Sequence, residues 1–97
     1  MTSWILETAD DPPVVLRLMP GSAKTIGRTA RADFILEAPL VSRVHCRLVA
    51  DRTDQLAVED LDSTNGIQVN GEKVSRSMLK TGDVLTVGRV AFTIRRE

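Results

Sequence analysis

The sequence is poor in the residues that form disulfides, bind metals or catalyse reactions. Its 97 residues include one cysteine, Cys46, and one histidine, His45. A single cysteine cannot form an intramolecular disulfide, so an oxidising compartment is not implied. Neighbouring residues of a strand point to opposite faces, so His45 and Cys46 cannot act together as a base and a nucleophile or as zinc ligands. We expect Cys46 in the core and His45 as a structural hydrogen-bonding residue.

The chain also lacks a net charge and any long apolar run. It has 13 basic and 13 acidic residues, which gives a formal net charge of zero. A protein that binds duplex nucleic acid needs a basic field that neutralises several phosphates, and this balance argues against that function. No stretch approaches the roughly 20 apolar residues of a membrane span, and the N-terminus has no signal-peptide pattern. We expect a cytoplasmic protein, or one of another reducing intracellular compartment, without membrane or nucleic-acid partners.

The length accommodates one hydrophobic core, so we expect a single domain over residues 1–97. Short apolar or alternating segments are separated by turn residues, and no segment has a sustained helical period. Asn70-Gly71 is the strongest hairpin signal, because both turn positions require a positive φ. This pattern predicts an all-β fold: a β-sandwich of two twisted, mainly antiparallel sheets with about ten to eleven short strands.

The expected strands are 4–8, 14–18, 24–27, 34–36, 43–50, 55–60, 67–69, 72–74, 84–87 and 90–94. Residues 75–79 are expected to form a helical turn. In the strand 43–50, alternation places Val44, Cys46 and Leu48 on one face and His45 and Arg47 on the other. The last strand runs nearly to the final residue, so the sequence is either a compact protein or a module of a longer one.

Three short stretches, each at a junction between an expected strand and a turn, carry groups that bind anions. They are Gly27-Arg28, Ser42-Arg43-Val44-His45 and Ser63-Thr64-Asn65-Gly66. Together they supply two guanidinium groups, several hydroxyls and an amide, which are the donors that hold a phosphate. No nucleophile in the sequence has a recognisable base beside it. We therefore expect a binding site and not an enzyme, with no cofactor and no metal.

The order and spacing of these stretches, followed by Val69-Asn70-Gly71, resemble the forkhead-associated (FHA) domain. The resemblance covers essentially residues 5–94. Its supporting positions are Asp33, Leu36, Asp60-Leu61, Leu79, Gly82-Asp83 and Gly88. One position departs from the family, because Ile67 stands where a threonine is common. The resemblance implies a β-sandwich whose loops at one end bind phosphothreonine peptides.

By this resemblance, five residues would contact the phosphopeptide. Arg28 would pair with the phosphate, and Ser42 would donate its hydroxyl to another phosphate oxygen. Arg43 occupies a position that often contacts the phosphate, although its identity varies within the family. Thr64 would donate to the phosphate or shape the pocket, and Asn65 would hold the peptide main chain. Gly27, His45 and Gly66 would support the site through close packing, loop bracing and turn geometry.

The resemblance also implies a signalling adaptor that binds a threonine-phosphorylated protein or peptide and is linked to a Ser/Thr protein kinase. The loop before Ser42 would face ligand residues after the phosphothreonine. There, either Leu40 would favour an apolar residue or Arg31 an acidic one. The alternative function is a phospho-independent structural or interaction scaffold on the same fold. Thr8, with its acidic neighbours, is a candidate phosphorylation site of the chain itself, which a buried hydroxyl would exclude.

Overall fold

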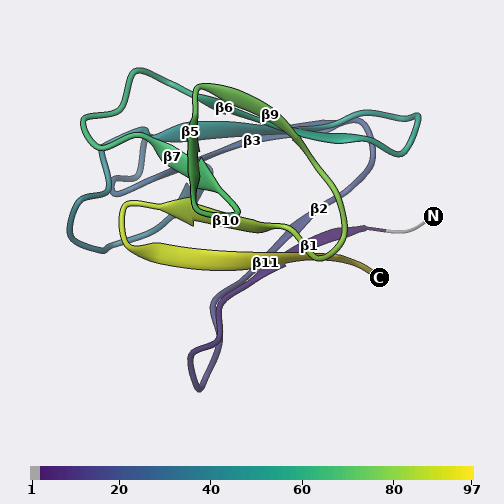
Figure 1. Cartoon of the computed structure of the whole chain (residues 1–97), viewed down its shortest axis with the longest axis horizontal. Helices are drawn as coiled ribbons and strands as arrows, with labels where there is room; N and C mark the ends of the chain where they lie inside the picture. Colours follow the sequence, from purple (N-terminus) through teal and green to yellow (C-terminus); the bar gives the residue numbers. More distant parts are fainter. Residues whose placement is uncertain (1–2) are drawn as a thin grey trace.

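The computed structural model describes residues 3–97, whose eleven strands form two sheets packed face to face (Figure 1). The six-stranded sheet has the order β2-β1-β11-β10-β7-β8, and the five-stranded sheet has the order β4-β3-β5-β6-β9. Among the described strands, β3 and β4 pair in parallel and every other pair is antiparallel. The predicted all-β sandwich is confirmed.

The strands of the six-stranded sheet are β1 (Trp4–Glu7), β2 (Val15–Leu18), β7 (Ile67–Val69), β8 (Glu72–Val74), β10 (Val84–Val87) and β11 (Val90–Arg96). Those of the five-stranded sheet are β3 (Ser22–Gly27), β4 (Phe34–Ile35), β5 (Cys46–Ala50), β6 (Leu56–Asp60) and β9 (Arg76–Leu79). Within residues 3–97 there is no helix that could cross a membrane.

The core lies between the two sheets and follows from alternation along the strands. In β5, Cys46, Leu48 and Ala50 are buried while the residues between them face solvent. They face Phe92 and other fully buried side chains of the opposite sheet. Each such aliphatic or aromatic side chain contributes about 1.5–3 kcal/mol when it is buried. Burial, reinforced by the nearby charge of Asp60, raises the pKa of Cys46 to about 12, so this thiol is an inert core group.

Two predicted segments differ from the structure. The strand expected from residue 43 begins at Cys46, because residues just before it bond outside the strand pairs: Arg43 O accepts from Thr29 N, and the His45 ring accepts from Ser42 N. Residues 76–79 form the strand β9 and not a helical turn, and they pair with β6 in the register Leu56↔Leu79. The edge of β6 needs hydrogen-bond partners, and this tertiary requirement overrides the weak local preference of the segment.

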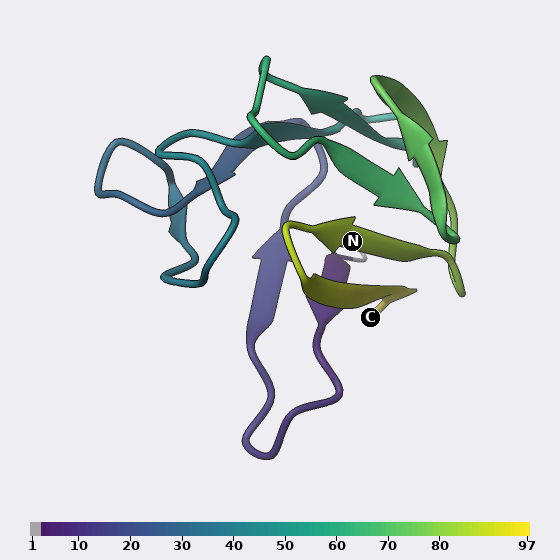
Figure 2. The same cartoon turned by 60° about the vertical axis from the view of Figure 1, so that its left-hand side comes forward.

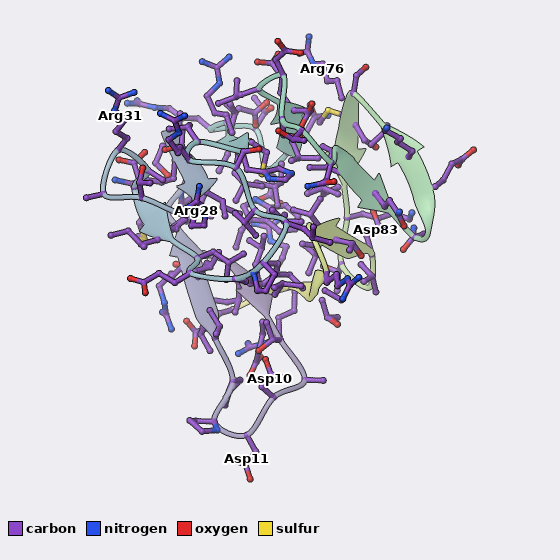
Figure 3. All side chains as sticks on the ribbon, turned by 90° about the vertical axis from the view of Figure 1, so that its left-hand side faces the viewer. Asp10, Asp11, Arg28, Arg31, Arg76 and Asp83 are labelled. Atoms are coloured by element: carbon purple, nitrogen blue, oxygen red, sulfur yellow. The ribbon has the colours of Figure 1, made fainter. Side chains whose placement is uncertain are left out.

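The β1–β2 hairpin extends away from the body of the sandwich, with Asp10 and Asp11 near its tip (Figure 3). Thr8 lies at its base with only 6% of its surface exposed, and its hydroxyl accepts a hydrogen bond from Val14 N at 2.8 Å. A kinase cannot reach a hydroxyl buried in this way, so the suggestion that Thr8 is a phosphorylation site is wrong for the folded protein.

The fold brings three loops to one end of the sandwich. Because β5 lies between β3 and β6 and runs antiparallel to both, the end of β3, the start of β5 and the end of β6 lie at the same end of the sheet. The loops that follow or precede these points are residues 28–33, 36–45 and 61–66. The first two lie together at the left of Figure 2, beyond the edge of the sheets. This end holds all the residues for which sequence analysis predicts phosphate binding.

Candidate functional site

Arg28 is the first residue after β3, and its side chain is fixed at its base. Its backbone N–H donates to Ser42 O at 2.9 Å, and its Nε donates to Val41 O at 3.0 Å. These bonds hold the guanidinium group beside the β4–β5 loop and leave its two terminal nitrogens for a ligand. Within residues 3–97, no carboxylate lies at ion-pair distance from Arg28, whereas Arg17, Arg47 and Arg95 each pair with a glutamate. Arg28 is therefore a positioned cation that can bind an anion.

Gly27, the last residue of β3, lets the segment before β5 pack closely against the end of β3. A β-carbon at this position would lie 2.2 Å from Arg43 O and 2.8 Å from Val44 Cα, which is far inside van der Waals contact. The same Arg43 carbonyl accepts hydrogen bonds from Thr29 N at 3.3 Å and Thr29 Oγ1 at 3.2 Å. A residue without a side chain is thus required for the segment around Ser42 to lie against the end of β3.

His45 joins two loops through a fully buried ring. Its Nδ1 accepts a hydrogen bond from Ser42 N at 3.0 Å, and its Nε2 lies 2.7 Å from Gly66 O. A backbone N–H can only donate and a carbonyl can only accept, so the proton of the ring is assigned to Nε2, which donates to Gly66. His45 therefore acts in the structure as a brace between the β4–β5 and β6–β7 loops.

Ser42 and Thr64 lie side by side where these loops meet. Ser42 Oγ accepts a hydrogen bond from Thr64 N at 3.1 Å, so the hydroxyl proton of Ser42 is left to donate elsewhere. The hydroxyl of Thr64 is exposed. Asn65 also joins the β6–β7 loop to the β4–β5 loop, because its Nδ2 donates to Leu40 O at 3.0 Å. The amide oxygen of Asn65 then remains as an acceptor for a ligand N–H.

The β6–β7 loop owes its shape to Asp60 and Ser63. Ser63 Oγ donates to Asp60 Oδ1 at 2.5 Å and accepts from Gly66 N at 2.9 Å, and Ser63 N donates to Asp60 Oδ2 at 3.2 Å. Gly66 has a φ of +75°, a conformation that favours glycine. Sequence analysis noted Asp60 only as a supporting position of the family resemblance, although aspartate and serine are both residue types whose side chains bond nearby backbone in turns.

The structure brings four of the five predicted ligand-binding residues, namely Arg28, Ser42, Thr64 and Asn65, into one hydrogen-bonded region across three loops. Arg43 lies at the same end, but it contributes to the region through its carbonyl, and its side chain is exposed. Arg31 is at the tip of the β3–β4 loop, apart from Arg28 (Figure 3). Leu40 is 43% exposed and has a φ of +69°.

Sequence reasoning missed the carbonyl groups of Leu40 and Val41, which orient Asn65 and Arg28. Backbone carbonyls are present in every residue, so no sequence signal could have identified these two. Sequence reasoning also gave Gly88 no contact in the site. A β-carbon on Gly88 would lie 3.1 Å from the carbonyl of Leu40, so the β10–β11 turn packs closely against the β4–β5 loop.

Comparison with known proteins agrees with this geometry. The family model of the FHA domain matches residues 24–88, which is more than half of the chain. The ABC transporter ATP-binding/permease protein Rv1747 of Mycobacterium tuberculosis is 36% identical over 72 residues, which are 74% of this chain and 8% of that protein. The chain spans less than a fifth of the length of the curated relatives that it matches.

Two solved structures share the fold along almost their whole length. The FHA domain of the CT664 protein of Chlamydia trachomatis has a TM-score of 0.88 and 25% identity, covering 95% of each chain. An FHA domain described for its phosphothreonine-dependent interactions has a TM-score of 0.87 and 33% identity, covering 96% of this chain and 95% of that one. The chain belongs to the FHA domain family.

Proposed function

We propose that this chain is a phosphothreonine-dependent peptide- or protein-binding module, used in protein-kinase-linked signalling or assembly. The observation that carries the proposal is the placement of Arg28 beside Ser42. The backbone N–H of Arg28 donates to Ser42 O, the Arg28 Nε donates to Val41 O, and the Ser42 hydroxyl accepts from Thr64 N, so both side chains are held close together in the fold and each keeps a donor for a ligand. A phosphate dianion has the charge and the three acceptor oxygens that such donors need.

The other predicted residues have separate proposed roles, some in binding the phosphate and one in binding the peptide backbone. Arg43 and Thr64 are exposed at the same end and are proposed to donate to the remaining phosphate oxygens. Asn65 is proposed to accept a hydrogen bond from a ligand backbone N–H through its amide oxygen, because its Nδ2 already donates to Leu40. Gly27, His45 and Gly66 do not touch the ligand in this proposal and instead hold the loops in register.

Family members support a binding function over a catalytic one. An FHA domain with 33% identity to this chain has phosphothreonine-dependent interactions. The FHA domain of FhaA, 32% identical in its solved structure, forms a complex with the intracellular domain of Rv3910. The preference for phosphothreonine over phosphoserine would come from the γ-methyl group, whose burial contributes about 0.8 kcal/mol, or roughly fourfold in affinity.

The test is calorimetric titration with degenerate peptide pools that contain phosphothreonine, phosphoserine or unmodified threonine. Arg28→Ala removes one partner of a charge-assisted pair, which costs about 2–5 kcal/mol, so its affinity should fall at least about thirtyfold. Arg52→Ala is the matched control, since Arg52 lies against Gly21 at the opposite end of the five-stranded sheet. Equal binding of phosphorylated and unmodified pools by folded protein would refute the proposal.

The alternative function, a phospho-independent interaction scaffold, is favoured by one further observation. A groove of about 250 Å³ crosses the outer face of β5, β6 and β9, and none of its lining residues belongs to the loops that carry Arg28, Ser42 and Thr64. Val49, Ala57 and Met78 form an apolar row across it, and Val49 and Met78 are exposed. Ala57→Arg would fill this groove. Binding of an unphosphorylated partner that Ala57→Arg abolishes and Arg28→Ala spares would establish the scaffold function.

A further inference from the structure

Lys73 lies on β8 and reaches toward the loop that carries Thr64 and Asn65. In the β7–β8 hairpin, Lys73 is directly opposite Gln68, so Gly66 is its diagonal neighbour on the same face. A β-carbon placed on Gly66 would lie 2.8 Å from Lys73 Cε and 3.5 Å from Lys73 Nζ. The stem of Lys73 therefore fills the space that Gly66 leaves by having no side chain, and its ammonium group lies beside the β6–β7 loop.

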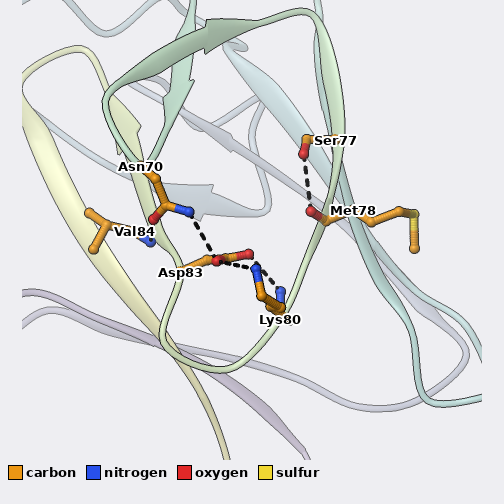
Figure 4. Close-up of polar contacts among 6 residues, drawn as sticks. All are labelled: Asn70, Ser77, Met78, Lys80, Asp83 and Val84. Carbon is orange, nitrogen blue, oxygen red and sulfur yellow. Dashed lines mark hydrogen bonds and ion pairs between the residues drawn. The ribbon is translucent and has the colours of Figure 1, made fainter.

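The hairpin that carries Lys73 is firmly anchored. Asn70 in its turn donates from Nδ2 to Asp83 Oδ1 at 3.0 Å and accepts from Val84 N at 2.9 Å through Oδ1 (Figure 4). Asp83 is buried and also accepts from Lys80 N at 2.9 Å and Lys80 Nζ at 3.1 Å. The turn that leads into β8 is thus tied to the β9–β10 connection and to the start of β10, which holds the backbone from which the Lys73 side chain extends.

Among the described residues, the charge of Lys73 has no ion-pair partner. Lys73 is exposed and has no carboxylate at ion-pair distance, whereas Lys80 is paired with Asp83. Its cross-strand neighbour, Gln68, is uncharged. The ammonium nitrogen lies 3.5 Å from the position of a β-carbon on Gly66, the residue that follows Asn65 in the chain. The charge of Lys73 therefore lies next to the point where Asn65 would hold the main chain of a ligand.

We propose that Lys73 is a specificity-determining residue, which favours an acidic side chain at one ligand position flanking the phosphothreonine. This inference rests on the proposed function and adds to it a charge preference that comes from β8. An exposed ion pair at this place should favour aspartate over alanine by about two- to fivefold and disfavour lysine by a similar factor. The preference requires neither Arg31 nor Leu40, the two residues to which sequence analysis assigned selectivity.

The experiment uses a phosphothreonine peptide array in which each flanking position in turn carries aspartate, alanine or lysine. Affinities are measured by fluorescence anisotropy for the wild type and for Lys73→Met, Lys73→Glu and Arg52→Glu. Lys73→Met keeps an apolar stem over Gly66 and removes the charge. Arg52→Glu makes the same change in net charge as Lys73→Glu, but beside Gly21, at the end of the five-stranded sheet away from the β6–β7 loop.

We expect the wild type to prefer aspartate over lysine at one position, Lys73→Met to lose that preference, and Lys73→Glu to invert it. Raising the salt concentration from 0.1 M to 1 M should shrink the preference, because the screening length falls from about 10 Å to about 3 Å. The wild-type preference should persist in Arg52→Glu. An unchanged preference in Lys73→Met, an equal shift in Arg52→Glu, or no charge preference at any position would overturn the inference.

Failure of the proposed function gives a different result in the same experiment. In that case unphosphorylated copies of the array bind as tightly as the phosphorylated ones, or Arg28→Ala binds as tightly as the wild type. If no peptide binds to any folded variant, the proposed function fails and this inference fails with it. If binding depends on phosphate and on Arg28 but not on the charge at residue 73, only the inference about Lys73 fails.

Discussion

His45 offers the sharpest test of how the site is held together, because one buried ring joins two loops. His45→Ala leaves the N–H of Ser42 and the carbonyl of Gly66 without their partners. Each unsatisfied buried group costs about 1–3 kcal/mol, and the lost ring volume adds to the cost. We therefore expect the free energy of unfolding to fall by about 2–6 kcal/mol, a large part of the total stability of a small domain.

The assay is urea unfolding of the wild type, His45→Ala and His45→Asn, followed by peptide titration of each variant that remains folded. An asparagine amide oxygen can take the place of Nδ1 and accept from Ser42 N, but it has no group that reaches Gly66 O. The free energy of unfolding of His45→Asn should therefore lie between that of His45→Ala and that of the wild type. Should His45→Ala unfold at the same urea concentration as the wild type, the reasoning that His45 braces the loops is refuted.

Three further predictions address the site and its support. Ser42→Ala should weaken phosphopeptide affinity by a loss of about 1.5–3 kcal/mol, measured by calorimetry, because a hydrogen bond to a charged group is removed; unchanged affinity would exclude a contact with phosphate. Gly27→Ala should lower both the unfolding free energy and the affinity, because its β-carbon would lie 2.2 Å from Arg43 O, and a variant as stable as the wild type would contradict this. Burial alone would raise the pKa of Asp83, but hydrogen bonds from Asn70 and Lys80 and the charge of Lys80 lower it below its ordinary value of 3.8. Ionised Asp83 therefore stabilises the fold at pH values above 3.8, and this contribution is lost as the pH falls through the lowered pKa. The free energy of unfolding, measured in urea between pH 6 and pH 2, should depend less on pH in Asp83→Asn than in the wild type.

Much of the fold could be predicted because its signals are local. Asn70-Gly71 forms the expected hairpin turn, with φ values of +53° and +82°. Alternation correctly separated Cys46 and Leu48, which are buried, from Arg47, which is exposed, but it grouped His45 with Arg47 although His45 is fully buried. The strand β9 was missed because residues 76–79 have no strong strand pattern of their own and pair with β6 only in the folded chain. The start of β5 was placed too early because Arg43 bonds with Thr29 and the ring of His45 with Gly66, and the sequence gives no sign of either contact.

The sequence by itself determined the chemistry available to this protein. Residue types and their order indicate an FHA-like β-sandwich and a loop end that carries arginines, hydroxyls and an amide. The formal net charge of zero argues against binding to duplex nucleic acid, and the single cysteine argues against thiol catalysis. These conclusions need only composition, short-range pattern and resemblance, because they depend on which groups are present and not on where each atom points.

The tertiary structure decided which atoms are free to act. Val41 O takes the Nε of Arg28, Thr64 N takes a lone pair of Ser42, and Leu40 O takes the Nδ2 of Asn65. These bonds join residues 13 to 25 positions apart, so only the packing of three loops could fix them. Lys73 reaches the β6–β7 loop for the same reason, since the space over Gly66 exists only once β7 and β8 are paired. Hydrogen bonding and close packing act over a few ångströms in space, and the folded backbone sets those distances.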